Sequence, residues 1–104
     1  MFQSYGIGDT YTPEPNQEAY AKAAGLEIPA GAELGLSGFR GTEYPANGNR
    51  SVNGEPITAV LIPADPNGEY DGHFVLFRDD DLAAQSMEFL GTAVRDGVPT
   101  VSAP

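Results

Sequence analysis

The 104-residue chain has no cysteine. It can therefore form neither disulfides nor thiolate metal sites, and a reducing compartment such as the cytoplasm is a natural origin. It also has no apolar run near the roughly 18 residues of a membrane-spanning helix. The first residues lack the basic and apolar regions of a signal peptide. We therefore expect a protein that is made in the cytoplasm and has no membrane partner.

Positive charge is scarce as well. Five basic residues stand against fifteen acidic ones, giving a formal net charge of −10. Such a balance argues against a phosphate-binding surface, so we expect no direct contact with nucleic acid. The acids are dispersed along the chain, which is typical of a solvated surface. One alternative stays open: an acidic inhibitor or immunity-type protein that blocks a basic enzyme or a nucleic-acid-binding surface.

Residue patterns that support catalysis are also missing. His73 is the only histidine, and no orienting partner or nucleophile can be identified for it from the sequence. Asp79–Asp81 are consecutive, whereas calcium loops space their ligands alternately, so helix capping explains them better. Serine and threonine residues show no nucleophile-elbow or triad spacing. We therefore expect no enzyme, no metal and no cofactor.

The clearest pattern that is present runs from residue 57 to residue 97. Ile57–Ile62 is apolar and β-branched, which predicts a strand that ends at Pro63. Asp65–Gly68 has turn residues at each position. His73–Phe77 is again apolar and predicts the returning strand of a hairpin. Both strands are apolar on both faces, so we expect them to be covered on two sides.

A helix is predicted after Arg78. Asp79–Asp81 supply capping oxygens and negative charge at its N-terminus, and Arg95 with Gly97 suits its C-terminus. The residues expected on its packed stripe are Leu82, Ser86, Phe89, Leu90, Ala93 and Val94.

Residues 1–12 form a predicted extended arm without helical periodicity. Its large side chains, Phe2, Tyr5, Ile7 and Tyr11, are set among glycines and small polar residues. The arm either packs back on its own domain or docks on a partner, for example by adding a strand to a sheet edge. In the second case these four residues are the candidate partner-binding anchors.

Residues 13–104 are expected to form a single domain, as the length suggests. Thr12–Pro13 predicts the start of a short helix that ends at Gly25 and is held mainly by Tyr20. Thirteen glycines and nine prolines predict many loops. The expected fold class is α+β: a small loop-rich domain with a β-hairpin or partial β-barrel, one C-terminal helix packed on it and a short N-terminal helix.

Four segments, taken in order, carry a resemblance to a known family. They are Ile28–Gly35, Ile57–Leu61 and Phe74–Arg78, each similar to a strand motif of that family, and Arg95–Val101, similar to its tail after a helix. In these segments the chain resembles the head decoration proteins of tailed bacteriophages, the family of the phage lambda capsid-stabilising protein.

The resemblance implies a structural virion protein rather than an enzyme. Such a protein would form a homotrimer on the outer surface of an expanded capsid, at local threefold positions, after synthesis in the host cytoplasm. Its major partner would be the major capsid protein, contacted through the N-terminal arm, here residues 1–12. A coat of this kind gains strength from many weak contacts acting together.

Overall fold

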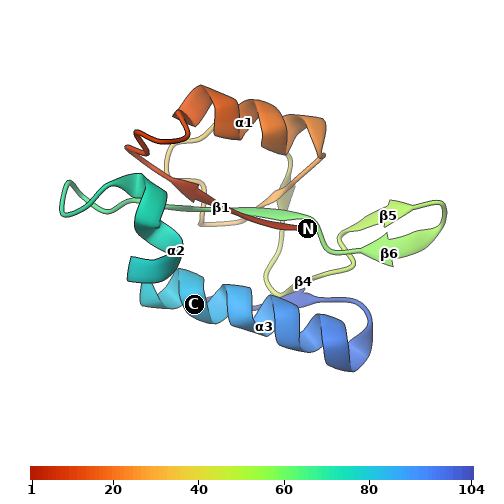
Figure 1. Cartoon of the computed structure of the whole chain (residues 1–104). Helices are drawn as coiled ribbons and strands as arrows, with labels where there is room; N and C mark the ends of the chain where they lie inside the picture. Colours follow the sequence, from red (N-terminus) through yellow and green to blue (C-terminus); the bar gives the residue numbers. More distant parts are fainter.

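The computed structural model describes all 104 residues as one α+β domain with many loops (Figure 1). Its helices are α1 (Glu14–Ala23), α2 (Val75–Arg78) and α3 (Asp80–Asp96), and a 3-10 turn, η1 (Gly72–Phe74), precedes α2. The fold class, with a short N-terminal helix and a packed C-terminal helix, is confirmed. The sheets are all two-stranded and no barrel closes. None of the helices combines the length and apolar character needed to cross a bilayer.

The strands are short and form four pairs. They are β1 (Phe2–Gly6), β2 (Ile28–Pro29), β3 (Gly41–Thr42), β4 (Ala46–Asn47), β5 (Arg50–Val52), β6 (Glu55–Ile57), β7 (Val60–Ala64) and β8 (Thr100–Val101). The pairs β1–β7 and β2–β3 are parallel, and β4–β8 and β5–β6 are antiparallel.

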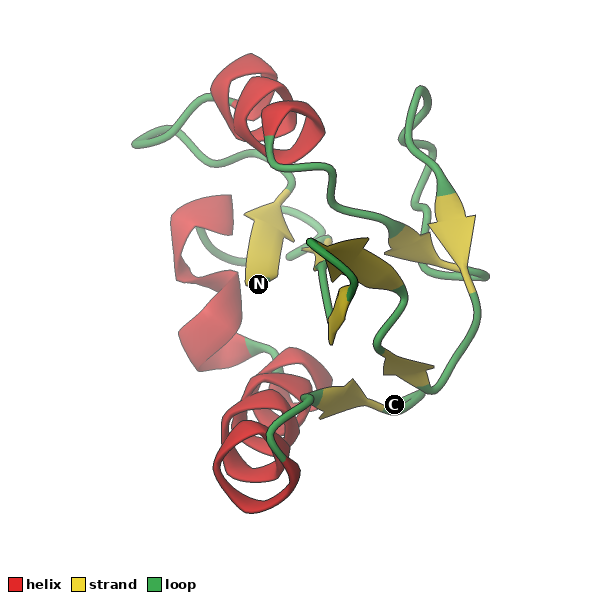
Figure 2. Cartoon of the chain, turned by 90° about the vertical axis from the view of Figure 1, so that its right-hand side faces the viewer, coloured by secondary structure: helices red, strands yellow, loops and turns green.

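The parallel pair β1–β7 is the centre of the molecule. All five residues of β7 are buried, and successive side chains of a strand point to opposite faces. One face packs under α1 and the other against α2 and α3, so the sheet lies between two helical layers (Figure 2). The prediction that this apolar run is covered on two sides is therefore confirmed.

Each face of the sheet has its own core. The cluster beside α2 and α3 contains Ala46, Val60, Ile62, Ala64, Val75, Leu82 and Val101. The cluster beside α1 contains Tyr5, Ala21, Leu26, Ile28, Ala59 and Leu61. Alternate residues of β7 enter the two clusters, which explains why the strand is apolar at every position.

The predicted hairpin between residues 57–62 and 73–77 is wrong. Residues 73–77 are helical, in η1 and α2, and β7 pairs with β1 instead. Asp71 favours the helical start because its side chain accepts a hydrogen bond from the N–H of His73. Pro63 lies inside β7. Only alternate residues of β7 form hydrogen bonds with β1, and Pro63 is not one of them, so its lack of an N–H is tolerated.

The predicted separation of an arm, residues 1–12, from a domain, residues 13–104, does not describe the structure. Phe2–Gly6 is a core strand, and Tyr5 is only 1% exposed. Of the two alternatives left open by the sequence, the arm packs back on its own domain. Burial of Tyr5 on one face and pairing with β7 along the edge stabilise this position.

The ends of α3 are as predicted, and its packed stripe is predicted in part: Leu82 is buried and Ser86, Phe89 and Ala93 are partly buried, whereas Leu90 and Val94 are exposed. The Asp79 side chain accepts a hydrogen bond from the N–H of Leu82 (2.9 Å), and Gly97 adopts φ 82° at the C-terminus. The buried residues are Leu82, Gln85 and Thr92. Leu90 and Val94 are 59% and 90% exposed, because the narrow sheet buries only one side of the helix.

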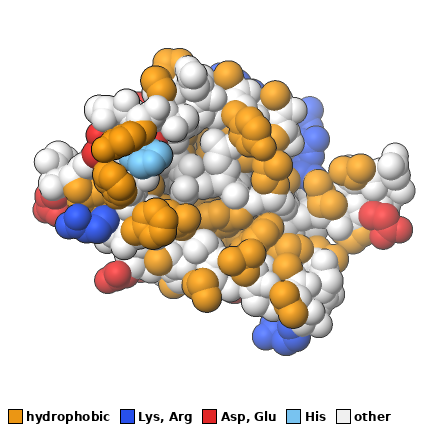
Figure 3. All heavy atoms as spheres, in the orientation of Figure 1, with side chains coloured by type: hydrophobic (Ala, Val, Ile, Leu, Met, Phe, Trp, Pro, Cys, Tyr) orange, Lys and Arg blue, Asp and Glu red, His pale blue; other side chains and the backbone are white.

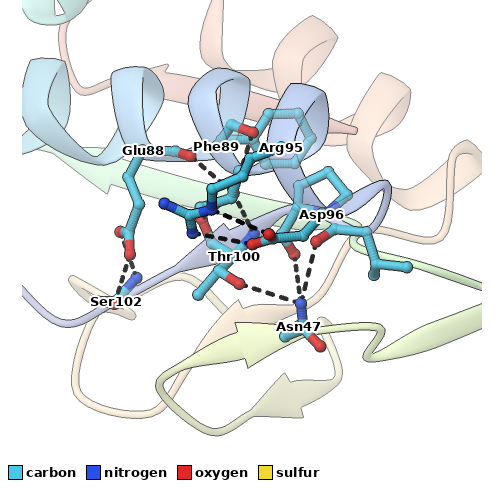
Figure 4. Close-up of polar contacts among 10 residues, drawn as sticks. Asn47, Glu88, Phe89, Arg95, Asp96, Thr100 and Ser102 are labelled. Carbon is cyan, nitrogen blue, oxygen red and sulfur yellow. Dashed lines mark hydrogen bonds and ion pairs between the residues drawn. The ribbon is translucent and has the colours of Figure 1, made fainter.

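Polar contacts fasten the C-terminal segment to α3 and β4 (Figure 4). Ser102 donates from its N–H and hydroxyl to Glu88 (2.7 and 2.6 Å). The N–H of Thr100 donates to Thr92 Oγ1 (2.7 Å). From the other side, the Asn47 amide donates to the carbonyls of residues 98 and 99 and to the Thr100 hydroxyl. These bonds fix β8 beneath the helix.

The first helix and the middle of the chain also differ from expectation. Tyr20 is 57% exposed, and α1 is held by buried Gln17 and Ala21 instead. Residues 50–57 form a β5–β6 hairpin around Asn53–Gly54, whose φ values of 52° and 81° suit a tight two-residue turn.

Candidate functional site: an interaction face

The four predicted anchors do not lie on one surface. Tyr5 is buried, and its hydroxyl donates to Glu14 (3.1 Å). Phe2 is half-buried, with its ring 5.8 Å from that of Phe89, and Ile7 is half-buried against the core cluster beside α1. Tyr11 alone is mostly exposed, at 65%. Of these four side chains, only that of Tyr11 is mostly available for contact with a partner.

Tyr11 belongs to a small exposed aromatic cluster, formed with His73 and Phe74. The rings of Tyr11 and His73 stack at 4.4 Å, and Phe74 meets both edge-on at 5.7 and 5.3 Å. Asp9 Oδ2 lies 3.3 Å from His73 Nδ1 and orients the imidazole. An oriented imidazole can exchange protons, but it forms no other side-chain hydrogen bond here, so this pair alone does not define a reaction.

The carboxylate of Asp71 connects the two segments that carry this cluster, the loop after β1 and the start of η1. Asp71 accepts hydrogen bonds from the Thr10 hydroxyl, from the Thr10 N–H (3.2 Å) and from the His73 N–H (2.9 Å). The bond from the Thr10 hydroxyl, followed by that from the His73 N–H, lowers the pKa of Asp71. The loop after β1 and the start of η1 are thus joined at the surface.

A groove of about 450 Å³ opens beside the aromatic cluster. Its lining includes Gln3, Ser4 and Gly6 of β1, with α1 on one side and η1 and α2 on the other. Figure 1 shows β1 passing between these helices. Close packing shapes one end of the strand: a Cβ on Gly6 would lie 1.8 Å from the carbonyl oxygen of Gly72. Only glycine at these positions lets η1 approach the strand so closely.

An apolar stripe lies on the solvent side of α3. We use this name for Met87, Leu90 and Val94, which are 67%, 59% and 90% exposed. Gly91 lies among them, and a Cβ added there would meet nothing within 4 Å. Phe77 of α2 is 80% exposed. Figure 3 shows hydrophobic side chains gathered over α2 and α3 on the face that also carries the histidine.

The apolar residues of α3 are spread over a wide arc of the helix. At 3.6 residues per turn, Leu90 and Val94 lie about 80° and about 120° around the helix from Leu82. An apolar stripe that faces a core is commonly about 100° wide or wider, so this arc alone does not separate packed from exposed residues. Which residues of this arc face solvent therefore depends on the width of the sheet beneath α3.

Most acidic side chains act within the fold. Ten of the fifteen take part in hydrogen bonds inside the chain: Asp9, Glu14, Glu18, Glu27, Glu33, Asp65, Asp71, Asp79, Glu88 and Asp96. One hollow is nevertheless rich in carboxylates, with Asp65, Glu69, Asp79, Asp80 and Asp81 around Arg78. No group of three or more histidine or acidic side chains is arranged to hold a metal ion.

The molecule thus presents an aromatic cluster that borders the groove along β1, since His73 belongs to both, and an apolar stripe on the solvent side of α3. Their chemistry is that of protein contact, since large exposed apolar groups favour burial against another surface. Comparison of the chain with family models, with curated proteins and with solved structures found no match.

Proposed function

We propose that the chain is a structural virion protein that associates as a homotrimer and binds the outside of a tailed-phage capsid, which it stabilises. The observation that carries this proposal is the apolar stripe of α3, whose three side chains are 59–90% exposed. A non-enzymatic coat protein needs surfaces that bind its own copies and the shell, and the stripe is suited to the first of these tasks.

The energetics of the stripe favour association. Complete burial of side chains such as Met87, Leu90 and Val94 is worth about 1.5–3 kcal/mol each relative to exposure. Part of that gain offsets the lost translational and rotational freedom of the copies. In a closed trimer each copy would contribute one stripe, so the gain recurs at every interface.

Contact with the major capsid protein is assigned to the aromatic cluster. Tyr11 is the exposed member of the predicted anchors, and aromatic side chains frequently dominate the free energy of protein association. The order of segments that resemble the decoration family supports the same partner. Two of these segments differ from the family's strands, because only Ile28–Pro29 of the first is a strand and residues 74–78 are helical.

The test measures association and shell binding together. Purified protein is mixed with undecorated, expanded tailed-phage capsids and sedimented, and its mass in solution is measured by light scattering. We expect co-sedimentation, and a trimer in solution or on the shell. The double variant L90S and V94S should lose the trimer while keeping its circular dichroism spectrum, because exposed substitutions usually change stability by only about 0.5 kcal/mol.

The matched control is V52S. Val52 is 53% exposed on the β5–β6 hairpin, away from α3. This variant should associate like the parent chain. A parent chain that neither forms trimers nor sediments with any capsid tested would contradict the proposal. Deleting residues 1–12 is not a useful probe, because it removes the core strand β1.

A second candidate is the acidic inhibitor, which the carboxylate-rich hollow around Arg78 favours. Such a protein would meet a basic enzyme surface with Asp80 and Asp81, which form no internal side-chain hydrogen bonds. The charge-reversed variant D80K and D81K separates the two proposals. It should keep capsid binding if the chain is a decoration protein, and lose binding to a basic nuclease surface if it is an inhibitor.

A further inference from the structure

The side of β1 that faces β7 is fully hydrogen-bonded. At its two ends the N–H of Val60 donates to the carbonyl of Met1 (2.9 Å), and the N–H of Ile7 donates to the carbonyl of Ala64 (3.0 Å). In a parallel pair the bonds come from alternate residues of a strand. The odd-numbered residues of this segment therefore bond to β7.

The even-numbered residues of β1 face the opposite edge. Gly6 shows this direction, because its N–H donates to Gln17 Oε1 (3.2 Å) and its carbonyl accepts from Gln17 Nε2 (3.5 Å). The backbone N–H and carbonyl groups of Phe2 and Ser4 have no partner in the chain. An edge with unpaired backbone groups is a template for another strand.

The Ser4 end of this free edge lies in the groove between α1 and η1, and the Phe2 end lies just outside its lining. Ser4 is one of the groove residues, and most of the side chains around it are uncharged, including Thr12, Asn16 and Gln17. Figure 3 shows the area beside the histidine as mainly white atoms, which are backbone and uncharged polar groups. Such a lining suits the backbone and short side chains of an extended segment.

We propose that the groove binds an extended segment of a partner protein, which adds to the Phe2–Ser4 edge as a further strand. The segment has β-branched and short polar residues and is flanked by lysine or arginine. Strand addition of this kind draws its affinity from main-chain hydrogen bonds. The basic flanks follow from the net charge of −10, which attracts cationic partners and repels anionic ones.

A second copy of the chain does not fit this edge. Its own β1 lies between α1 and η1 in the same way, so the two edges cannot approach each other without a clash of helices. A slender segment can enter where a folded domain cannot. The inference is independent of the capsid proposal, since it concerns the isolated chain and a peptide.

The probe is a synthetic peptide, acetyl-Lys-Lys-Thr-Val-Thr-Val-Thr-Lys-Lys-amide, titrated into isotope-labelled protein. We expect saturable changes in the backbone amide signals of Phe2 and Ser4 and of the surrounding groove. The variant S4P removes an N–H that the fold does not use, and proline is tolerated at such edge positions. It should weaken binding by about tenfold or more, through the lost hydrogen bond and the obstructing ring.

Two controls isolate the main-chain contacts. S4A keeps the backbone N–H and should bind within about threefold of the parent, because the Ser4 hydroxyl forms no hydrogen bond in the fold. A peptide methylated at alternate backbone nitrogens should lose binding to the parent chain, which serves as the test if S4P does not fold.

Three results would overturn the proposal: no signal changes at peptide concentrations near about 1 mM, the weak end of the affinity range; changes confined to α3; or equal binding of the methylated peptide. A peptide with glutamate in place of the flanking lysines should bind more weakly at low salt, and equal or tighter binding would contradict the stated charge of the partner.

Discussion

At the scale of single residues, Tyr5 is a buried core residue and not the exposed anchor that the sequence predicted. Its ring fills the core beside α1, while its hydroxyl donates to Glu14 and lies 3.5 Å from Glu18. Burial, then the hydrogen bond to Glu14 and the charge of that carboxylate, raise the pKa of Tyr5. The neutral form is therefore the one that the fold stabilises.

This raised pKa predicts a loss of stability in alkali. The unfolded chain releases the tyrosine proton near its ordinary pKa of about 10, whereas the folded chain retains it, so stability falls as pH rises above about 10. Y5F should show a smaller fall between pH values of about 8 and 11 in urea unfolding. At the lower pH it should be less stable by about 1 kcal/mol, since the bond to Glu14 is lost.

The control for this titration is Y20F, because Tyr20 is mostly exposed on α1. Its unfolding should follow the pH dependence of the parent chain. An equal alkaline fall in Y5F and the parent would show that another group causes the loss.

At the scale of elements, the start of α3 is fixed by one of three consecutive aspartates. Only Asp79 stands at the N-cap, with its side chain bonded to the N–H of Leu82, while Asp80 and Asp81 lie in the first turn. D79A should lower the free energy of unfolding by about 1 kcal/mol, the usual effect of removing an N-cap. Thermal or urea unfolding measures the change.

D80A is the matched substitution within the same run. It removes a carboxylate that interacts favourably with the helix dipole without forming the cap, an effect of about 0.3–1 kcal/mol. A loss in D80A as large as that in D79A would show that charge alone, rather than the cap, stabilises this helix start.

At the scale of the whole molecule, net charge and the apolar stripe act against each other. Each copy carries −10, so copies repel one another, whereas Met87, Leu90 and Val94 favour association. Salt screens the repulsion and leaves apolar burial largely intact. The proposed self-association should therefore strengthen between salt concentrations of about 20 and 300 mM in sedimentation velocity. Association that weakens with added salt would indicate an interface made of charge pairs instead.

Local patterns were sufficient wherever the chemistry is local. The cap at Asp79, the stop at Gly97 and the α+β class with its two main helices follow from neighbouring residues, and the structure agrees. The hairpin failed because an apolar run such as residues 73–77 suits a buried strand or a short buried helix equally well. Because β7 pairs with β1, which lies far earlier in the chain, residues 73–77 are not needed as its partner strand and form a helix.

The candidate site depended still more on distant contacts. The sequence alone determined the acidic charge, the apolar run that became β7 and both ends of α3, because these depend on composition and on residues within one turn. Only the tertiary structure decided that the N-terminal segment is a core strand with a free edge, and that Leu90 and Val94 face solvent. Strand partners and the buried side of a helix are set by what packs against them, and that information is spread over the whole chain.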